Sequence, residues 1–238
     1  MTSYANLLIA VFLALLAACA SACTDIGSRD KEMYEERQID EFDGVKVSGG
    51  IRVTVYFDPV TRVEINTSSA NPGRIYTRVR DGVLQIGQKS TFFASRSARV
   101  DVYTPEINFL VASGGSEIRM DETISGKSVE LKASGGSNMH AGVNTDFLRV
   151  RASGGAEMRL AGFASELSAR ASSGSRISGY DLETALAGVE ASSGADVRIT
   201  VSDELNARAS SGGGIRYRGS PKVVNSKASS GGSVSPSR

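Results

Sequence analysis

The sequence predicts an all-β fold, a parallel β-helix with coils of about 19 residues, from two observations. The first is a four-residue repeat, Ala-Ser-Gly-Gly or Ala-Ser-Ser-Gly, at intervals of 18 to 21 residues. Its copies begin at Ala112, Ala133, Ala152, Ala171, Ala191, Ala209 and Ala228, and an earlier copy with Val in place of Ala begins at Val47. A unit this short cannot bury an apolar face alone, so stacked coils are expected.

The second observation is that apolar residues alternate with polar ones on both sides of the motif, which is the period of a strand. Two residues before each alanine stand Leu110, Leu131, Val150, Ala169, Val189, Ala207 and Ser226. Six residues after it stand Ile118, Met139, Met158, Ile177, Val197, Ile215 and Val234. Each unit is therefore expected to form a strand, a tight Ser-Gly turn and a second strand. Glycine permits the positive φ of such a turn, and serine can bond neighbouring backbone.

Composition excludes several classes of site. The net charge is only +1, so no overall field attracts nucleic acid. The chain has one histidine, His140, and both cysteines lie within the first 23 residues. The folded part therefore offers neither a cysteine nucleophile nor a Cys or multi-His metal site, and we expect no metal and no cofactor.

The N-terminus predicts export. Residues 7–18 are twelve consecutive apolar residues, too few for a membrane span and typical of a signal peptide, which we place at residues 1–18. Leu16-Ala17-Ala18-Cys19 matches the lipobox of bacterial lipoproteins, so Cys19 is the expected lipidated residue. Cys23, which also follows small residues, is the alternative, and simple secretion after an Ala-x-Ala cleavage is another. A lipid at this cysteine would hold the protein at a membrane surface.

Residues 19–41 are polar and charged, which predicts a lipidated tether to the folded domain, with a short helix over residues 31–38 left open. The β-helix domain is placed at residues 42–236. Its regular coils cover residues 109–236. Residues 52–108 are less regular, with strand-like runs and turn signals at Asn71-Pro72-Gly73 and Asp81-Gly82. They form either longer coils of the same helix or a sheet that caps it.

Three segments resemble a known family: FDGVKVSGGIRVTV at residues 42–55, the repeated Ser-Gly-Gly corners, and GSPKVVNSKASSGGSV at residues 219–234. They are similar to the "putative auto-transporter adhesin, head GIN domain" family over roughly residues 42–236. The resemblance implies a right-handed β-helix in an exported or lipid-anchored bacterial protein. It carries over no catalytic or binding motif.

Two columns of outward residues are mostly basic. One residue before the alanine stand Lys132, Arg151, Arg170 and Arg208, and seven residues after it stand Arg119, Arg159, Arg198 and Arg216. Stacked like charges are unfavourable unless something neutralises them, and an acidic column five residues after the alanine could do so in part. These eight residues are the candidate surface for an anion or acidic glycan. The alternative is a solvated face that keeps the rod from aggregating.

Signs of catalysis are weak. Asp101, Glu117, Asp121 and Glu122 are candidate carboxylates for glycan cleavage, but no spacing singles out a pair. His140 occupies a column position that arginine takes in neighbouring coils, as an ordinary surface residue would. The pair Phe92-Phe93 could be an exposed loop tip, although buried core is the simpler interpretation.

We therefore expect a non-enzymatic cell-envelope lipoprotein, anchored at the outer membrane on its periplasmic side or at the cell surface. It would act as an adhesin or bind a glycan or a surface protein, with no nucleic-acid partner. One alternative is a β-helix enzyme that cleaves polysaccharides. The other is a structural module that docks, or forms a homo-oligomer, through an open end of the solenoid.

Overall fold

The protein is described by a computed structural model that covers residues 33–67, 72–88 and 98–237. The predicted signal peptide, Cys19, Cys23 and Phe92-Phe93 lie outside the described residues. The N-terminal strands are β1 (Met33–Gln38), β2 (Gly44–Val47), β3 (Arg52–Phe57), β4 (Arg62–Thr67), β5 (Ile75–Arg80), β6 (Val83–Gln88), β7 (Arg99–Thr104) and β8 (Phe109–Ala112), with a 3₁₀ turn, η1 (Pro72–Arg74). They are followed by β9 (Glu117–Ser134), β10 (Asn138–Ser153), β11 (Glu157–Ala171), β12 (Arg176–Ala191), β13 (Asp196–Ala209), β14 (Gly214–Arg218), β15 (Val223–Ala228) and β16 (Ser233–Pro236).

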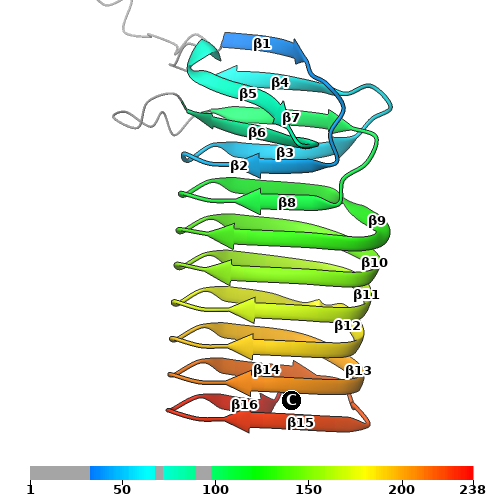
Figure 1. The fold of residues 1–238 in the computed structure, drawn as a ribbon, viewed down its shortest axis with the longest axis vertical. Coiled ribbons are helices and arrows are strands. Elements are labelled where there is room, and N and C mark those ends of the chain that lie inside the picture. Colours follow the sequence, from blue (N-terminus) through cyan, green and yellow to red (C-terminus); the bar gives the residue numbers. More distant parts are fainter. Residues whose placement is uncertain (1–32, 68–71, 89–97, 238) are drawn as a thin grey trace, which may run out of the picture. The chain divides into compact units, whose positions relative to one another are not determined.

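These strands form a β-solenoid of about seven turns, which confirms the predicted fold class (Figure 1). Neighbouring coils from β8 to β16 pair in parallel. In Figure 1 the chain runs leftwards along the near side, turns at the glycine corner, returns behind and steps down one layer. This path makes the solenoid right-handed, as the family resemblance implied.

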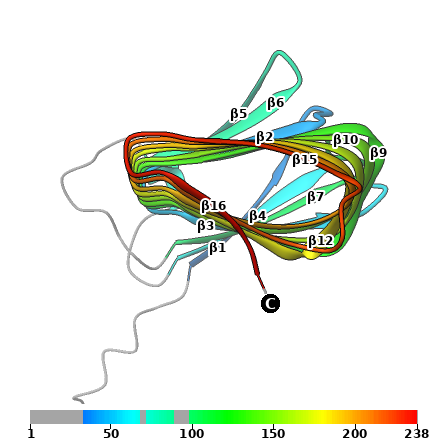
Figure 2. The same cartoon turned by 90° about the horizontal axis from the view of Figure 1, so that it is seen from below.

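Two sheets face each other across the core (Figure 2). The front sheet, nearest the viewer in Figure 1, contains β5, β6, β2, β8, β15 and those halves of β9–β13 that precede the glycine corner. The back sheet contains β1, β4, β7, β3, the other halves of β9–β13, β14 and β16. Each strand from β9 to β13 bends from the back sheet into the front sheet, so a single strand contributes to both faces.

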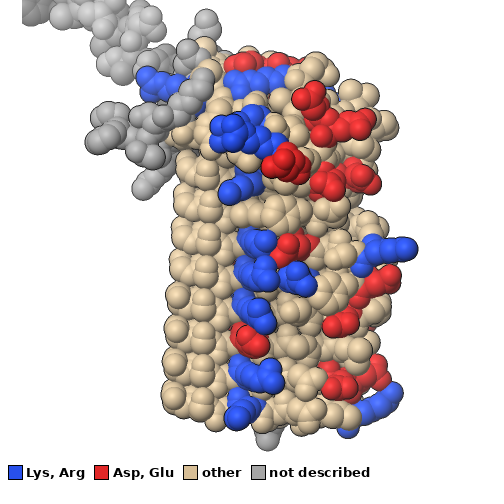
Figure 3. Space-filling view, in the orientation of Figure 1, with Lys and Arg blue, Asp and Glu red and all other residues tan. Residues whose placement is uncertain are grey.

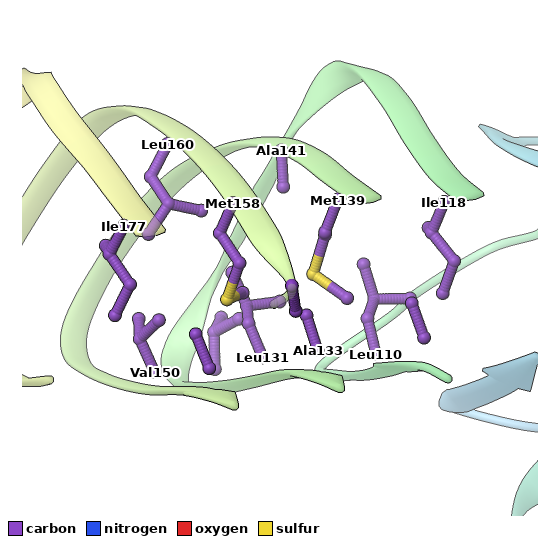
Figure 4. Close-up of a cluster of buried hydrophobic side chains, with 14 of the residues drawn as sticks. Leu110, Ile118, Leu131, Ala133, Met139, Ala141, Val150, Met158, Leu160 and Ile177 are labelled. Carbon is purple, nitrogen blue, oxygen red and sulfur yellow. The ribbon is translucent and has the colours of Figure 1, made fainter. Parts of the chain in front are cut away.

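Ladders of similar apolar side chains fill the space between the sheets. Leu110, Leu131 and Val150 stack in register from the front sheet. Met139 and Met158 do so from the back sheet, and all five are at most 2% exposed. Figure 4 shows the two sets pointing toward one another. The apolar positions derived from the repeat therefore form the core, because alternation places every second residue inward.

The glycine corner explains the repeated motif. Its third and fourth residues have positive φ in every coil, including Ser173 (φ 54°) and Ser193 (φ 51°), where serine replaces the first glycine. The N–H groups of the second glycine donate to the next corner, as Gly115 does to the Gly135 carbonyl at 3.0 Å. Where a serine follows the motif its hydroxyl is buried, and that of Ser137 donates to the Ala112 carbonyl of the preceding coil at 3.0 Å.

Variation in coil length is absorbed at the bend opposite the glycine corner. The register of the long strands shifts between His140 and Gly142, between Arg159 and Ala161, and between Gly179 and Glu183. The pair β12–β13 has a second shift, between Thr184 and Leu186, and the segments outside these shifts stay paired. Intervals of 18 to 21 residues therefore leave the faces of the solenoid aligned.

The irregular segment 52–108 combines the two structures that the sequence left open. Its strands β6 and β7 form a coil that pairs in parallel with the earlier coil made of β2 and β3. The next coil in the chain, β8 and the start of β9, pairs with the other side of β2 and β3. The order of coils in the stack thus differs from their order in the sequence. Strand β4 pairs antiparallel with β7, and β5 pairs antiparallel with β6, so the two strands form a cap on the coil of β6 and β7.

Residues 33–38, which the sequence analysis placed in the tether, form β1 and pair antiparallel with β4. The alternative of a short helix there is wrong. Glu35 and Arg37 pair with the buried residues Ile65 and Val63, so charged side chains occupy the inward positions of β1. For this reason the sequence of β1 shows no alternation of apolar and polar residues. Over the described residues, no helix has the length and apolar character needed to cross a membrane.

Candidate functional site

The predicted basic column on the front sheet exists in the register that the repeat predicted. Lys132 pairs with Arg151, and Arg151 pairs with Arg170. Glu190 separates Arg170 from Arg208, which pairs with Lys227 in the last coil. All these side chains point outward, because the alanine that follows each is buried or, in the last coil, continues the same inward row. Figure 3 shows the column as a line of basic side chains along the front face.

The other four predicted residues lie on the back sheet. Arg119 and Arg159 flank His140 in register, and Arg198 pairs with Arg216 further along. The core separates the two sheets (Figure 2), so the eight predicted residues form two surfaces rather than one groove.

Carboxylates contact all four predicted arginines of the back sheet. Each arginine there has an acidic partner close in sequence or in an adjacent coil. The pairs are Arg119–Asp121 at 2.8 Å, Arg159–Glu157 at 2.8 Å, Arg198–Asp196 at 3.0 Å and Arg216–Asp196 at 3.8 Å. Asp196 also contacts Arg176 at 3.6 Å, so three cations share it, whereas Arg119 and Arg159 each have a carboxylate of their own.

The front sheet has fewer acids for its basic residues. Glu130 contacts both Lys132, at 3.2 Å, and Arg151, at 2.8 Å. Glu190 contacts Arg170 at 3.1 Å and Arg208 at 3.8 Å. Each carboxylate is thus shared by two cations, which leaves positive charge in excess.

Three further basic residues, which were not among the eight candidates, extend this surface. Lys46 lies in the same column on β2, Arg149 in the adjacent column on β10, and Lys227 at the last coil. The repeat itself places Lys227 in this column and could have identified Lys46 in the same way, because each precedes the first residue of a motif copy. We call the seven residues the front basic surface: Lys46, Lys132, Arg149, Arg151, Arg170, Arg208 and Lys227.

A shallow recess lies at the centre of the front basic surface. It has a volume of about 190 Å³ and is lined by Arg149, Val150, Arg151, Ser168 and Arg170. Guanidinium groups present several N–H donors in a planar fork that fits carboxylate, sulfate or phosphate oxygens. The recess can therefore hold an anionic group from solution without a metal ion.

Two half-buried aromatic rings lie beside this surface. The guanidinium of Arg149 is 5.4 Å from the centre of the Phe147 ring, and Nζ of Lys132 is 4.8 Å from that of Phe109. The rings hold the cationic groups in place through cation–π contacts. They also provide apolar edges that the sequence analysis did not single out.

The four carboxylates considered for glycan cleavage have separate neighbours. Glu117 pairs with Arg52 at 3.1 Å, and Glu122 accepts the Phe57 N–H at 3.0 Å. Asp121 is the partner of Arg119. Asp101 lies opposite Glu64, and burial raises the pKa of its carboxyl, as does the neighbouring Glu64 charge. Among the described residues, no group of three or more His, Cys, Asp and Glu side chains is placed to bind a metal ion.

Comparison with known proteins gives a family and a fold. The family model described as "Putative auto-transporter adhesin, head GIN domain" matches residues 41–221. Curated proteins give no match.

Solved structures that are similar to the chain include a putative adhesin from Bacteroides fragilis, at 16% identity and a TM-score of 0.79. A putative adhesin from Parabacteroides distasonis has 19% identity and a TM-score of 0.69, and a putative lipid binding protein from the same species has 16% and 0.64. Each comparison covers 87% of this chain and 97% of the other. At these identities the likeness shows a shared solenoid fold.

Proposed function

Because the chain belongs to the head GIN domain family of putative auto-transporter adhesins, we propose that it is a non-enzymatic binding module of the cell envelope. Its ligand is an acidic glycan, which lies along the front basic surface. The observation that carries this proposal is the difference between the two sheets. Among the described residues, the seven cations of the front basic surface contact two carboxylates, Glu130 and Glu190. The four predicted arginines of the back sheet contact three carboxylates, Asp121, Glu157 and Asp196, the last of which also contacts Arg176.

The geometry of the front sheet favours an extended ligand over a compact one. Adjacent coils are about 4.8 Å apart, so the basic side chains form a line along the solenoid axis. A polymer with repeated carboxylate or sulfate groups can contact several coils at once. The recess around Arg149, Arg151 and Arg170 provides the densest group of donors on that line. Phe109 and Phe147 offer apolar contacts to sugar rings beside it.

Binding to glycans tests this function. The probe is a panel of acidic and neutral glycans, presented at low and high salt to the chain from Thr24 onward. This fragment omits both cysteines and retains Met33–Arg238, which form one compact unit. We expect binding to acidic glycans that weakens with salt, because salt screens exposed charges.

A matched pair of triple variants locates the binding surface. Arg151→Ser, Arg170→Ser and Arg208→Ser together should weaken binding about tenfold, since exposed ionic contacts contribute roughly 0.5 kcal/mol each. The control, Arg119→Ser, Arg159→Ser and Arg198→Ser, changes the net charge equally on the back sheet and should retain binding. Equal losses in both variants, or no glycan binding by the parent protein, would refute the proposal.

We further propose that the protein is anchored at the outer membrane through a lipid on Cys19. The support is the lipobox at residues 16–19 together with membership of a family named for auto-transporter adhesins. Incorporation of labelled fatty acid in cells should be abolished by Cys19→Ala and retained in Cys23→Ala. The opposite result would move the anchor to Cys23, and labelling of neither protein would indicate simple secretion.

A further inference from the structure

The two ends of the solenoid are built differently. At the N-terminal end, the outermost strands are β1 and β5, and Arg37 points inward between them. Its guanidinium donates to the carbonyl oxygens of Ile75, at 2.8 Å, and Pro72, at 3.2 Å, and to the hydroxyl of Thr77 at 3.0 Å. An inward-pointing charge at an edge strand opposes addition of another strand. This end is therefore closed.

At the C-terminal end, no layer formed by the described residues covers the inward rows. Val224 stacks on Leu205, and Ser226 stacks on Ala207. Leu205 is fully buried, whereas Val224 is 41% exposed and its neighbour Val223 is 45% exposed. All six residues of β15 are exposed. The last coil thus presents part of the core to solvent.

The backbone of β15 is also available. Within the described part of the chain, β15 pairs only with β13, so one edge of β15 keeps unpaired N–H and C=O groups. The strand contains no proline and no inward charge, because its only charged residue, Lys227, lies in the outward column with Arg208. These are the features that permit strand addition.

Charge at this end indicates the occupant. Residues 219–237 contain no acidic residue and two lysines; Lys222 is paired with Asp203 at 2.6 Å, so Lys227 supplies the charge beside the free edge. In the coils above, Glu190 lies in register between Arg170 and Arg208 and contacts both, at 3.1 and 3.8 Å. In this part of the basic column, a carboxylate in the adjacent coil forms ion pairs with the arginines. An added strand with an acidic side chain beside Lys227 would form an ion pair with this lysine in the same way.

We propose that the free edge of β15 is a docking site for an extended segment of a partner protein. In this segment, small apolar side chains that cover Val224 alternate with acidic side chains that face Lys227. A second copy of the chain fits less well, because a twofold interface would bring the basic ends together and a head-to-tail contact would meet the end closed by Arg37. Asn225 and Ser226 keep the edge polar, which suits reversible docking.

Two labelled peptides test the proposal on the chain from Thr24 onward. In one, valine alternates with glutamate, and in the other, valine alternates with lysine. Fluorescence anisotropy should show binding of the glutamate peptide only, and amide hydrogen exchange should slow in β15. Val224→Lys should abolish binding, although it adds a positive charge, because the new side chain points inward. Val60→Lys, at a site 56% exposed near the other end, is the matched control and should retain binding.

Charge reversal gives a second readout that does not depend on blocking the edge. Lys227→Glu, which leaves the Lys222–Asp203 ion pair intact, should shift the preference from the glutamate peptide to the lysine peptide. Binding of neither peptide, equal binding of both, or full binding by Val224→Lys would overturn the proposal. Sedimentation that shows a dimer lost in Val224→Lys would assign the edge to a second copy and equally overturn it. None of these outcomes depends on glycan binding by the arginines of the central coils.

Discussion

Gly162 shows how closely adjacent coils approach at the bend. Its φ is +108°, and a Cβ built on it would collide with the carbonyl oxygen of Val143 in the preceding coil. Both the backbone conformation and the space therefore require glycine at this position. Gly126, at the equivalent bend of β9, has no positive φ and no atom within 4 Å of an added Cβ.

We expect Gly162→Ala to lower the free energy of unfolding by about 2 to 4 kcal/mol, as backbone strain and a steric collision add. The matched variant Gly126→Ala should change it by no more than about 0.5 kcal/mol. Urea denaturation of both variants measures the difference. Similar stabilities for the two would mean that the bend is loosely packed.

At the residue scale, the sequence predicted inward and outward positions well. Strand alternation and one shared corner define them, so Leu131, Met158 and Arg151 all lie where the repeat placed them. The sequence could not predict which carboxylate meets which arginine. Glu130 reaches Arg151 across one coil, and that contact depends on rotamers of long side chains rather than on the period of the strand.

At the scale of the strands, the cap brings two carboxylates together. Asp101 on β7 lies opposite Glu64 on β4. Burial raises the pKa of Asp101 most, Glu64 raises it further, and Arg99 and a hydrogen bond with Thr54 oppose the change. A carboxyl with a raised pKa in the folded state stabilises the fold at low pH. That contribution is present below the ordinary value of 3.8 and is lost as pH rises through the folded pKa.

We therefore expect Asp101→Asn to be more stable than the parent protein at neutral pH. The difference should shrink as pH falls toward 3.8, because the parent carboxyl then becomes neutral too. Thermal unfolding at several pH values measures it. In a Glu64→Gln background the difference should be smaller, because one of the two causes that raise the pKa of Asp101 is removed. A less stable Asp101→Asn protein at neutral pH would show that the contacts with Arg99 and Thr54 outweigh the burial of charge.

The capping strands were the hardest elements to place from the sequence. The residue runs of β4, β6 and β7 indicated strands, but no shared corner motif fixes their partners. Pairing of such strands is decided by tertiary contacts. The coil of β6 and β7 therefore lies on the far side of the coil of β2 and β3, an arrangement that coil spacing cannot predict.

At the scale of the whole molecule, the solenoid separates tasks among its surfaces. The arginines of the back sheet have more carboxylate partners than the cations of the front sheet, and the two ends differ in the exposure of their outermost strands. The sequence predicted the line of basic residues on each sheet. It could not predict which line remains unneutralised, because that depends on acids contributed by adjacent columns.

The bend that absorbs register shifts also affects how such a molecule can change over generations. Insertions or deletions there alter neither the spacing of the front basic surface nor the glycine corner, since the segments on both sides remain paired. Loops that leave the ends of a scaffold in place cost little stability. The bend is thus the edge where each coil can acquire or be given a new loop. The spacing of side chains on both sheets stays the same when this happens.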